Sequence, residues 1–175
     1  MEDRERRLAL ETLFTEHATA VRAYAMRRTD PAGADDTVME VFVIACRRLD
    51  QMPADALPWL LACARRVLAN QRRGAERQRA LAARLETRTS PTAPDREPGG
   101  QSLMRALAEL SERDREVLLL IAWEGLEPVR AAAALECSRA TLAVRLHRAR
   151  RRLAAALERQ QETDVRPTEP TEAVT

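Results

Sequence analysis

Apolar residues in the first part of the chain recur at spacings of three and four, which is the period of a helix with one buried face. One such stripe covers residues 8–28 and a second covers residues 34–48, with a turn rich in Asp, Pro and Gly between them. A third stripe begins at Pro58 and continues to residue 85, since proline suits the first position of a helix. The intervening residues 49–57 predict a loop.

The second half of the chain repeats this pattern in shorter segments. Ser111 is placed to cap a helix that is apolar on nearly every face over residues 117–123. We therefore expect this helix, with Trp123, to lie in the core. Gly125 suits the end of the helix, because glycine readily adopts the left-handed conformation found there.

Two further helical patterns in residues 127–153 are separated by a short break, Glu136-Cys137-Ser138. Pro128 suits the start of the first helix and Ser138 the cap of the second, so this is the pattern of a helix-turn-helix. Such a break often uses glycine for a positive φ, which glutamate tolerates poorly. In the second helix Leu142, Leu146, Ala149 and Leu153 share one face, so the outer face consists of Ala140, Thr141, Val144, His147, Arg148 and Arg151.

The segments that lack periodicity divide the chain. Residues 86–101 concentrate Pro, Thr and Gly and predict a flexible linker, while the polar residues 158–175 predict a disordered tail. Aromatic residues make up only 3% of the chain, and Ala, Leu and Arg dominate, which favours helices over strands. We predict an all-α fold of two small helical domains, residues 8–85 and 102–157, joined by the linker.

The distribution of charged residues indicates a function as well as a fold. All 29 basic residues are arginines, and the net charge of +2 hides a local asymmetry. Residues 139–157 contain six arginines and no acidic residue, which suits contact with DNA. The competing interpretation is a solvated basic helix of an interaction protein, although such a helix normally interleaves Glu. A second basic cluster, which argues for contact with two separated DNA segments, consists of Arg65, Arg66, Arg72, Arg73, Arg77 and Arg79.

An acidic surface is predicted for residues 30–50, which precede the basic cluster of residues 65–79. It would repel DNA and complement a basic protein partner, although carboxylates at the start of a helix are also ordinary. Its members are Asp30, Asp35, Asp36, Glu40 and Asp50.

Other classes of protein fit the sequence poorly. No apolar run approaches the roughly 18 residues that cross a bilayer, and the charged start is unlike a signal peptide, so we expect a cytoplasmic protein without membrane contact. Cys46, Cys63 and Cys137 follow no disulfide or metal pattern, and the first two fall on apolar stripes and are expected to be buried. Without a phosphate loop, metal-ligand spacing or Ser/His/Asp arrangement, we expect neither an enzyme nor a cofactor.

Four motifs in this order resemble those of the extracytoplasmic-function sigma factors, the compact bacterial subunits that direct RNA polymerase to promoters. Residues 35–42 are similar to the acidic motif of region 2, and residues 59–73 to its promoter-melting helix. Residues 110–118 and 138–150 are similar to the two parts of region 4. The resemblance spans residues 8–157 and implies a region 2 domain followed by a region 4 helix-turn-helix domain.

The resemblance also implies three sets of contacts. Docking on the coiled coil of the largest polymerase subunit would involve Asp35, Asp36, Met39, Glu40 and Phe42. Melting and capture of the minus-ten element, together with loop 49–57, would involve Trp59, Arg65, Arg66, Asn70, Arg72 and Arg73. Reading of the minus-thirty-five duplex would involve Ser138, Arg139, Ala140, Thr141, Val144, Arg145, His147, Arg148 and Arg151.

Further partners follow from the same resemblance. The linker would thread the polymerase cleft and RNA exit path, and the flap-bearing subunit is a further expected partner. An anti-sigma factor that covers residues 35–42 is a candidate partner as well. Trp59 itself fits the stacking of an unpaired base and a place in the core equally well.

The chain departs from the family pattern at five positions. Met39 stands where Gln is usual, Arg66 where Asn is usual, Arg130 where an acidic residue is usual, and Glu136 and Ala140 where Gly is usual. Two other functions therefore stay open. A stand-alone helix-turn-helix regulator would bind duplex DNA without polymerase. A degenerate adaptor would bind core polymerase without promoter preference.

Overall fold

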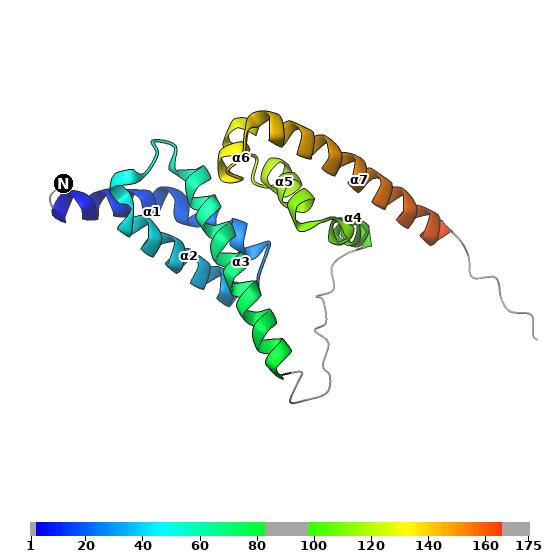
Figure 1. Cartoon of the computed structure of the whole chain (residues 1–175), viewed down its shortest axis with the longest axis horizontal. Helices are drawn as coiled ribbons and strands as arrows, with labels where there is room; N and C mark the ends of the chain where they lie inside the picture. The colour runs from blue at the N-terminus through cyan, green and yellow to red at the C-terminus, as the bar shows by residue number, and fades with distance from the viewer. Residues whose placement is uncertain (1–2, 83–97, 166–175) are drawn as a thin grey trace, which may run out of the picture.

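The computed structural model describes residues 3–82 and 98–165, and in these ranges it contains helices but no strand (Figure 1). The helices are α1 (Asp3–Met26), α2 (Pro31–Arg47), the 3-10 helix η1 (Leu49–Gln51), α3 (Ala56–Ala82), α4 (Pro98–Glu109), α5 (Glu112–Ala122), α6 (Pro128–Ala134) and α7 (Arg139–Val165). The predicted all-α fold is confirmed. No described helix combines the length and the apolar character needed to span a membrane.

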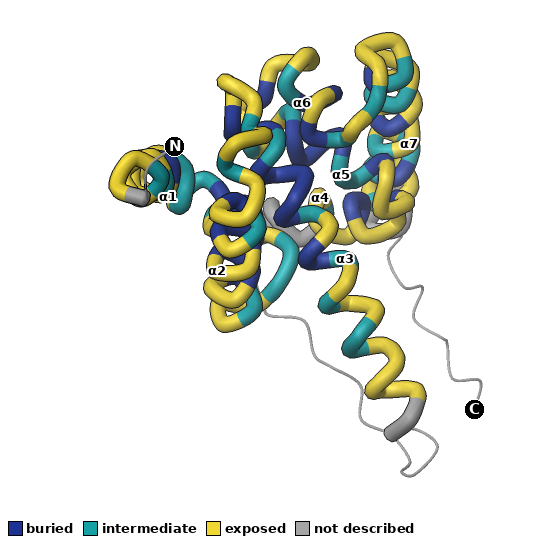
Figure 2. The backbone as a smooth tube through the Cα atoms, turned by 60° about the vertical axis from the view of Figure 1, so that its left-hand side comes forward, coloured by how far each residue is buried: buried dark blue, intermediate teal, exposed yellow. Residues whose placement is uncertain are grey.

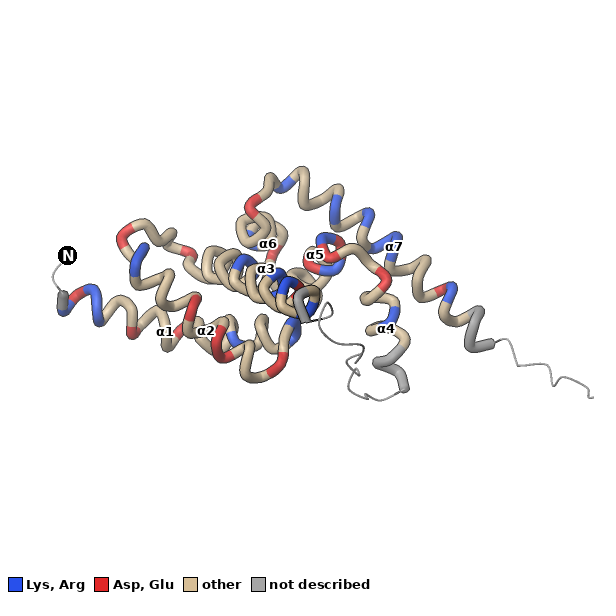
Figure 3. The backbone as a smooth tube through the Cα atoms, turned by 60° about the horizontal axis from the view of Figure 1, so that its bottom comes forward, with Lys and Arg blue, Asp and Glu red and all other residues tan. Residues whose placement is uncertain are grey.

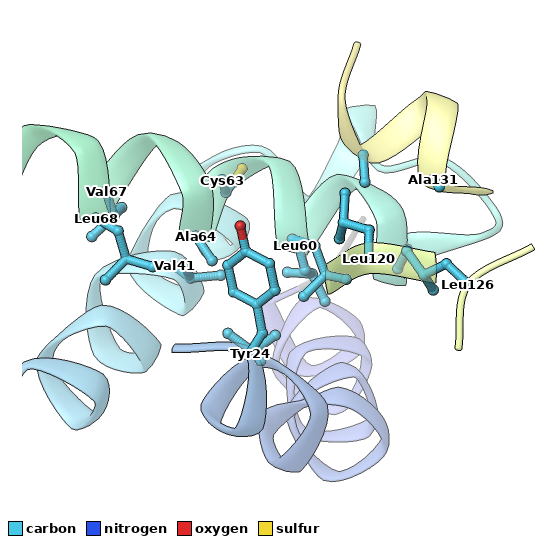
Figure 4. Packing of buried hydrophobic residues seen from close by; sticks show 14 of the residues in the cluster. Tyr24, Val41, Leu60, Cys63, Ala64, Val67, Leu68, Leu120, Leu126 and Ala131 are labelled. Carbon is cyan, nitrogen blue, oxygen red and sulfur yellow. The ribbon is translucent and has the colours of Figure 1, made fainter. Parts of the chain in front are cut away.

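Helices α1, α2 and α3 form the N-terminal unit. Asp30 caps α2, since its Oδ1 accepts a hydrogen bond of 2.7 Å from the Gly33 backbone N–H, and a proline occupies the first turn. Tyr24, Val41 and Leu60 are fully buried where the three helices meet (Figure 4). The apolar stripes predicted for this part of the chain therefore face one another.

Helices α4 to α7 form the C-terminal unit, and its helix ends follow the predicted caps. Ser111 accepts a hydrogen bond of 3.2 Å from the backbone N–H three residues on, and Ser138 does the same at 3.1 Å. Gly125 has a φ of 63°, in the left-handed region. Helices α6 and α7 are joined by the predicted break, so the helix-turn-helix is present.

The two units share one apolar core. Leu60 of α3 belongs to the same buried cluster as Leu120 of α5, Ala131 of α6 and Leu142 of α7, and Figure 4 shows α3 lying against α5 and α6. Figure 2 shows the buried residues gathered there, while the last turns of α3 project away and are largely exposed. A smaller cluster within the C-terminal unit consists of Leu107, Leu110, Leu118 and Ala149. The units are thus packed together rather than held by a linker alone.

Buried charges join α1 to α5 beside this core. Tyr24 donates a hydrogen bond of 2.6 Å from its hydroxyl to Glu116, and Arg28 donates from Nε to the other oxygen of Glu116 at 3.0 Å. Arg28 also donates to Glu124 at 3.2 Å, and its guanidinium lies 3.5 Å from the centroid of the Tyr24 ring. Burial, together with the charge of Glu116, raises the pKa of Tyr24, which keeps the hydroxyl protonated as a donor.

Two predicted boundaries are wrong. Helix α4 begins at Pro98, so residues 98–101 are helical rather than part of the linker, and the rest of the linker up to residue 97 lies outside the described residues. Helix α7 continues to Val165, so residues 158–165 are not a disordered tail. Gln160, in this additional part of α7, forms side-chain hydrogen bonds with Ser102 and Glu109 of α4. These bonds hold the end of α7 against α4. The remaining tail, residues 166–175, lies outside the described residues.

Two predicted core residues are exposed. Trp123 is 45% exposed because α5 ends at Ala122, and Trp123 is the residue that follows the last helical position. Cys46 is exposed as well, whereas Cys63 is buried as predicted. The prediction from apolar character on every face therefore overestimated the burial of Trp123 at the end of α5.

Candidate DNA and polymerase interfaces

Helix α7 presents the predicted outer face to solvent. Leu142 and Ala149 are fully buried, and Leu146 and Leu153 pack against the core clusters. On the opposite face Val144 is 50% exposed. The other exposed members of the predicted minus-thirty-five set are Ser138, Arg139, Ala140, His147, Arg148 and Arg151, and Thr141 and Arg145 are half-buried. Figure 3 shows the arginines spaced along this helix.

The turn before α7 is the short break that the sequence predicts. Glu136 has a φ of 51°, in the left-handed region. Its backbone N–H donates to the carbonyl of Ala133 at 3.1 Å, and the N–H of Cys137 donates to the carbonyl of Ala132 at 3.0 Å. This pair of bonds is a Schellman motif, in which glycine is the usual residue at the position of Glu136. The departure from glycine thus leaves the helix-turn-helix geometry intact.

Asp114 anchors α7 to α5 from inside the C-terminal unit. It is 6% exposed, accepts a hydrogen bond of 2.8 Å from the Ser111 hydroxyl, and forms a salt bridge with Arg152 of α7. Burial alone would raise the pKa of Asp114, but the bonds from Ser111 and Arg152 outweigh it and lower the pKa. The carboxylate therefore stays charged and fixes the helix that carries the outer basic face.

The predicted minus-ten residues lie along α3 in two different settings. Trp59 packs against the buried core, whereas Asn70 is exposed and accepts a hydrogen bond from Arg73. Arg66 and Arg72 are exposed as well, yet each forms a salt bridge with a carboxylate of the C-terminal unit. The structure therefore places Trp59 among the core contacts.

The acidic face predicted on α2 is at the surface. Asp36 and Glu40 are exposed, and Met39 is 65% exposed. Phe42 is different, since it is only 7% exposed and its ring lies 4.8 Å from that of Phe14, centroid to centroid. Phe42 therefore supports the packing of α2 on α1 and does not form part of the exposed face.

Asp35 and Val43 complete that face. Asp35 is exposed and accepts a hydrogen bond of 2.7 Å from the Nε atom of Arg22. Val43 is 46% exposed in the next turn after Met39, and sequence analysis did not single it out. Val43 is four residues after Met39 and therefore lies on the same face of the helix, and this spacing could have identified it from the sequence.

A pocket of about 310 Å³ lies between α2 and α3. It joins Glu40 of the acidic face to Arg66 and Asn70 of the basic helix. Arg47 and Arg48 also line it, although sequence analysis did not name them. The acidic and basic surfaces of the N-terminal unit thus meet at this pocket.

Comparison with known proteins gives both halves of the chain a counterpart. The family model of sigma-70 region 2 matches residues 13–78, and that of sigma-70 region 4 matches residues 100–153. SigL of Mycobacterium tuberculosis, an extracytoplasmic-function RNA polymerase sigma factor, is 29% identical over 157 residues, which cover 85% of this chain and 89% of that protein. The RNA polymerase sigma factor NccH of Alcaligenes xylosoxydans is 29% identical over 159 residues, covering 82% of each.

Solved structures agree with this match. The sigma factor RpoE of Bartonella quintana, solved with the anti-sigma factor NepR, has a TM-score of 0.64 and 25% identity, covering 85% of this chain and 96% of that one. CnrH, solved with the cytosolic domain of CnrY, has a TM-score of 0.59 and 26% identity, covering 87% of this chain and 89% of that one.

The chain thus carries the two regions of a sigma-70 factor, region 2 followed by region 4. The chain belongs to the extracytoplasmic-function sigma factors.

Proposed function

We propose that the protein binds core RNA polymerase in the cytoplasm and directs promoter-specific initiation by recognising and melting promoter DNA, without enzymatic activity of its own. The observation that carries this function is the presence of two arginine-rich helices, one in each sigma-70 region, beside an exposed acidic face on α2. We assign region 2 to the unit formed by α1 to α3 and region 4 to the unit formed by α4 to α7.

The exposed face of α2 is the proposed contact with the largest polymerase subunit. Asp35, Asp36 and Glu40 supply charge, while Met39 and Val43 supply apolar area that no other part of the described chain covers. Charged and apolar groups together suit a protein partner, since charge favours encounter and apolar area favours a long-lived complex.

The basic face of α3 is the proposed minus-ten contact. Arg65, Arg66, Arg72 and Arg73 lie along one helix, and guanidinium groups bind phosphates through paired hydrogen bonds. Asn70 lies among them and carries both a donor and an acceptor for an exposed base edge. Trp59 is assigned to the packing of α3, because it lies against the core.

The outer face of α7 is the proposed minus-thirty-five contact. Its first turns combine the small apolar Ala140 and Val144, which suit thymine methyl groups, with Arg148, which suits guanine or a phosphate. Arg139, Arg145, Arg148 and Arg151 form no salt bridge among the residues whose side chains the structure describes, 4–80 and 102–161, so their donors are available to DNA. The intact geometry of the turn at Glu136 favours this function over a degenerate adaptor.

An anti-sigma factor is a further proposed partner. RpoE, with which this chain shares its fold, was solved in complex with the anti-sigma factor NepR, and CnrH, also of this fold, was solved with the cytosolic domain of CnrY. The exposed apolar residues Met39 and Val43 on α2 give a protein partner a place to bind. Such a regulator would compete there with polymerase.

The test mixes the purified protein with core polymerase and sequences run-off transcripts from fragmented genomic DNA. We expect discrete start sites that share two spaced upstream elements. Glu40→Arg should abolish these transcripts, whereas Glu11→Arg, the same reversal on exposed α1, should leave them unchanged. Polymerase binding without discrete starts would favour the adaptor. Absence of polymerase binding would favour an independent regulator.

A further inference from the structure

Charged contacts connect the two units outside the shared apolar core, and they pair carboxylates of one unit with arginines of the other. Glu136 of the helix-turn-helix break forms salt bridges with Arg65, at 3.2 Å, and with Arg66. Glu112, at the start of α5, forms a salt bridge with Arg72. The contacts therefore follow α3 over about two turns of its exposed face.

These three arginines are among the four that are proposed to hold minus-ten DNA. A carboxylate presents its two oxygens to a guanidinium much as a phosphate does, so both ligands compete for the same hydrogen-bond donors. The outer basic face of α7 has no such competitor among the described residues. Contact between the units thus affects one DNA surface and leaves the other free.

A bidentate salt bridge adds to this contact on the far side of the helix-turn-helix. Arg130 of α6 donates to both oxygens of Asp55, at 2.7 and 2.8 Å. Arg66, Arg130 and Glu136 are three of the positions at which the resemblance to the family implies another residue. With Asn, an acidic residue and Gly at these positions, neither the Glu136–Arg66 bridge nor the Asp55–Arg130 bridge could form. The departures are thus complementary in charge across one interface.

We propose that Glu112 and Glu136 occupy the minus-ten arginines in the DNA-free protein as substitutes for DNA phosphates. Promoter DNA has to displace both carboxylates before these arginines can bind it. The protein therefore has a closed form, in which the C-terminal unit covers part of α3, and an open form that binds minus-ten DNA. The assignment rests on the proposed function, because that function identifies the arginines as DNA contacts.

The chemistry of the contact suits reversible closure. The side chains of Glu112 and Glu136 are 72% and 45% exposed, and exposed salt bridges contribute little to stability. The Nε atom of Arg65 is buried without a hydrogen-bond partner among the described residues, which is a cost of the closed form. A polyanion that offers many phosphates can therefore displace the two carboxylates.

The test compares two double variants that carry the same change of charge. Glu112→Gln/Glu136→Gln removes both carboxylates from the contact. Glu109→Gln/Glu158→Gln, the control, changes two acidic residues of the C-terminal unit that have no contact with the N-terminal unit. Fluorescent labels at Glu11→Cys and Gln161→Cys, in a chain whose natural cysteines are replaced, report the distance between the units by energy transfer.

We expect the contact variant to lower energy transfer relative to the parent and the control. It should also bind a single-stranded oligonucleotide carrying a minus-ten element about three- to tenfold more tightly at one fixed salt concentration. The oligonucleotide should itself lower energy transfer in the parent.

Equal energy transfer in the parent, the contact variant and the control would overturn the proposal, as would oligonucleotide binding that leaves the parent closed. Run-off transcription of the same proteins separates the two inferences. If even the parent supports no transcription with core polymerase, the proposed function fails, while the energy-transfer result still decides whether the two glutamates close the protein.

Discussion

Two basic helices, α3 and α7, differ in what surrounds their arginines. On α3, Arg65, Arg66 and Arg72 each meet a carboxylate from the other unit. On the outer face of α7, arginines such as Arg148 form no salt bridge within the described residues, although the charge of Arg148 acts on Asp114. Similar composition thus produces two different surfaces. A run of arginines indicates affinity for phosphate, but its three-dimensional neighbours decide whether that affinity is available.

The largest expected effect is at the buried charges that join the units. Arg28→Ala leaves the buried Glu116 without its salt-bridge partner, while Glu124 keeps its salt bridge with Arg27, and loss of one partner from a buried pair typically costs about 3–5 kcal/mol. We expect the free energy of unfolding, measured by urea titration, to fall by about 3 kcal/mol. Arg22→Ala, on α1, breaks the exposed salt bridge to Asp35 of α2 and should lower the free energy of unfolding far less, because solvent screens an exposed pair. Equal losses would contradict the buried contact between the units.

The next effect concerns the unpaired arginines of α7. Arg148→Ala should weaken binding to the minus-thirty-five duplex by about 1–3 kcal/mol, roughly tenfold, because a free guanidinium contributes its full contact to DNA. Arg159→Ala makes the same change of charge further along α7, beyond the proposed DNA face, and serves as the control. Affinities are compared by fluorescence anisotropy at one salt concentration. Indistinguishable affinities of the two variants would remove α7 from the minus-thirty-five contact.

The sequence was most informative where a local rule decided the structure. The apolar stripes, the serine caps and Gly125 predicted the helices and their ends, because these depend on residues close together in the chain. The positive φ at Glu136 was not predicted, because glutamate tolerates this conformation poorly. The recognition face of α7 followed from the positions of its buried leucines.

The contact between the units could not be predicted in this way. An apolar stripe shows that a face is buried but not what covers it, so Leu60 gave no sign of packing in one cluster with Ala131. The partners Arg66 and Glu136 are separated by 70 residues. Such pairings depend on how preformed helices fit together. Phe42 is a different case, since its place on the apolar stripe of α2 predicted its burial and only the resemblance assigned it to the polymerase contact.

The pH dependence of stability should distinguish the anchoring of α7 from the salt bridges on α3. The pKa of Asp114 is lowered from its ordinary value of 3.8, so its stabilising contribution is complete above that pH and is lost as the pH falls through the lower pKa of the folded state. We expect Asp114→Asn to cost about 1–2 kcal/mol at neutral pH and to flatten the acid dependence of unfolding below about pH 4. Glu158→Asn, an exposed change on α7, should preserve the parent's acid profile. An Asp114→Asn profile as steep as the parent's would contradict this assignment.

The smallest effect separates the two roles of Glu136. Glu136→Gly relieves the left-handed backbone but removes the carboxylate from Arg65 and Arg66, whereas Glu136→Gln keeps the strained backbone and removes only the charge. We expect the Gly variant to be more stable than the Gln variant by about 1 kcal/mol in urea titration, because a non-glycine residue pays a conformational cost at positive φ. Both variants should free Arg65 and Arg66 to the same extent, while Arg72 keeps its salt bridge with Glu112. If so, the contact with α3 explains why this chain carries glutamate where the turn alone favours glycine. Equal stability of the two variants would show that the turn carries no strain.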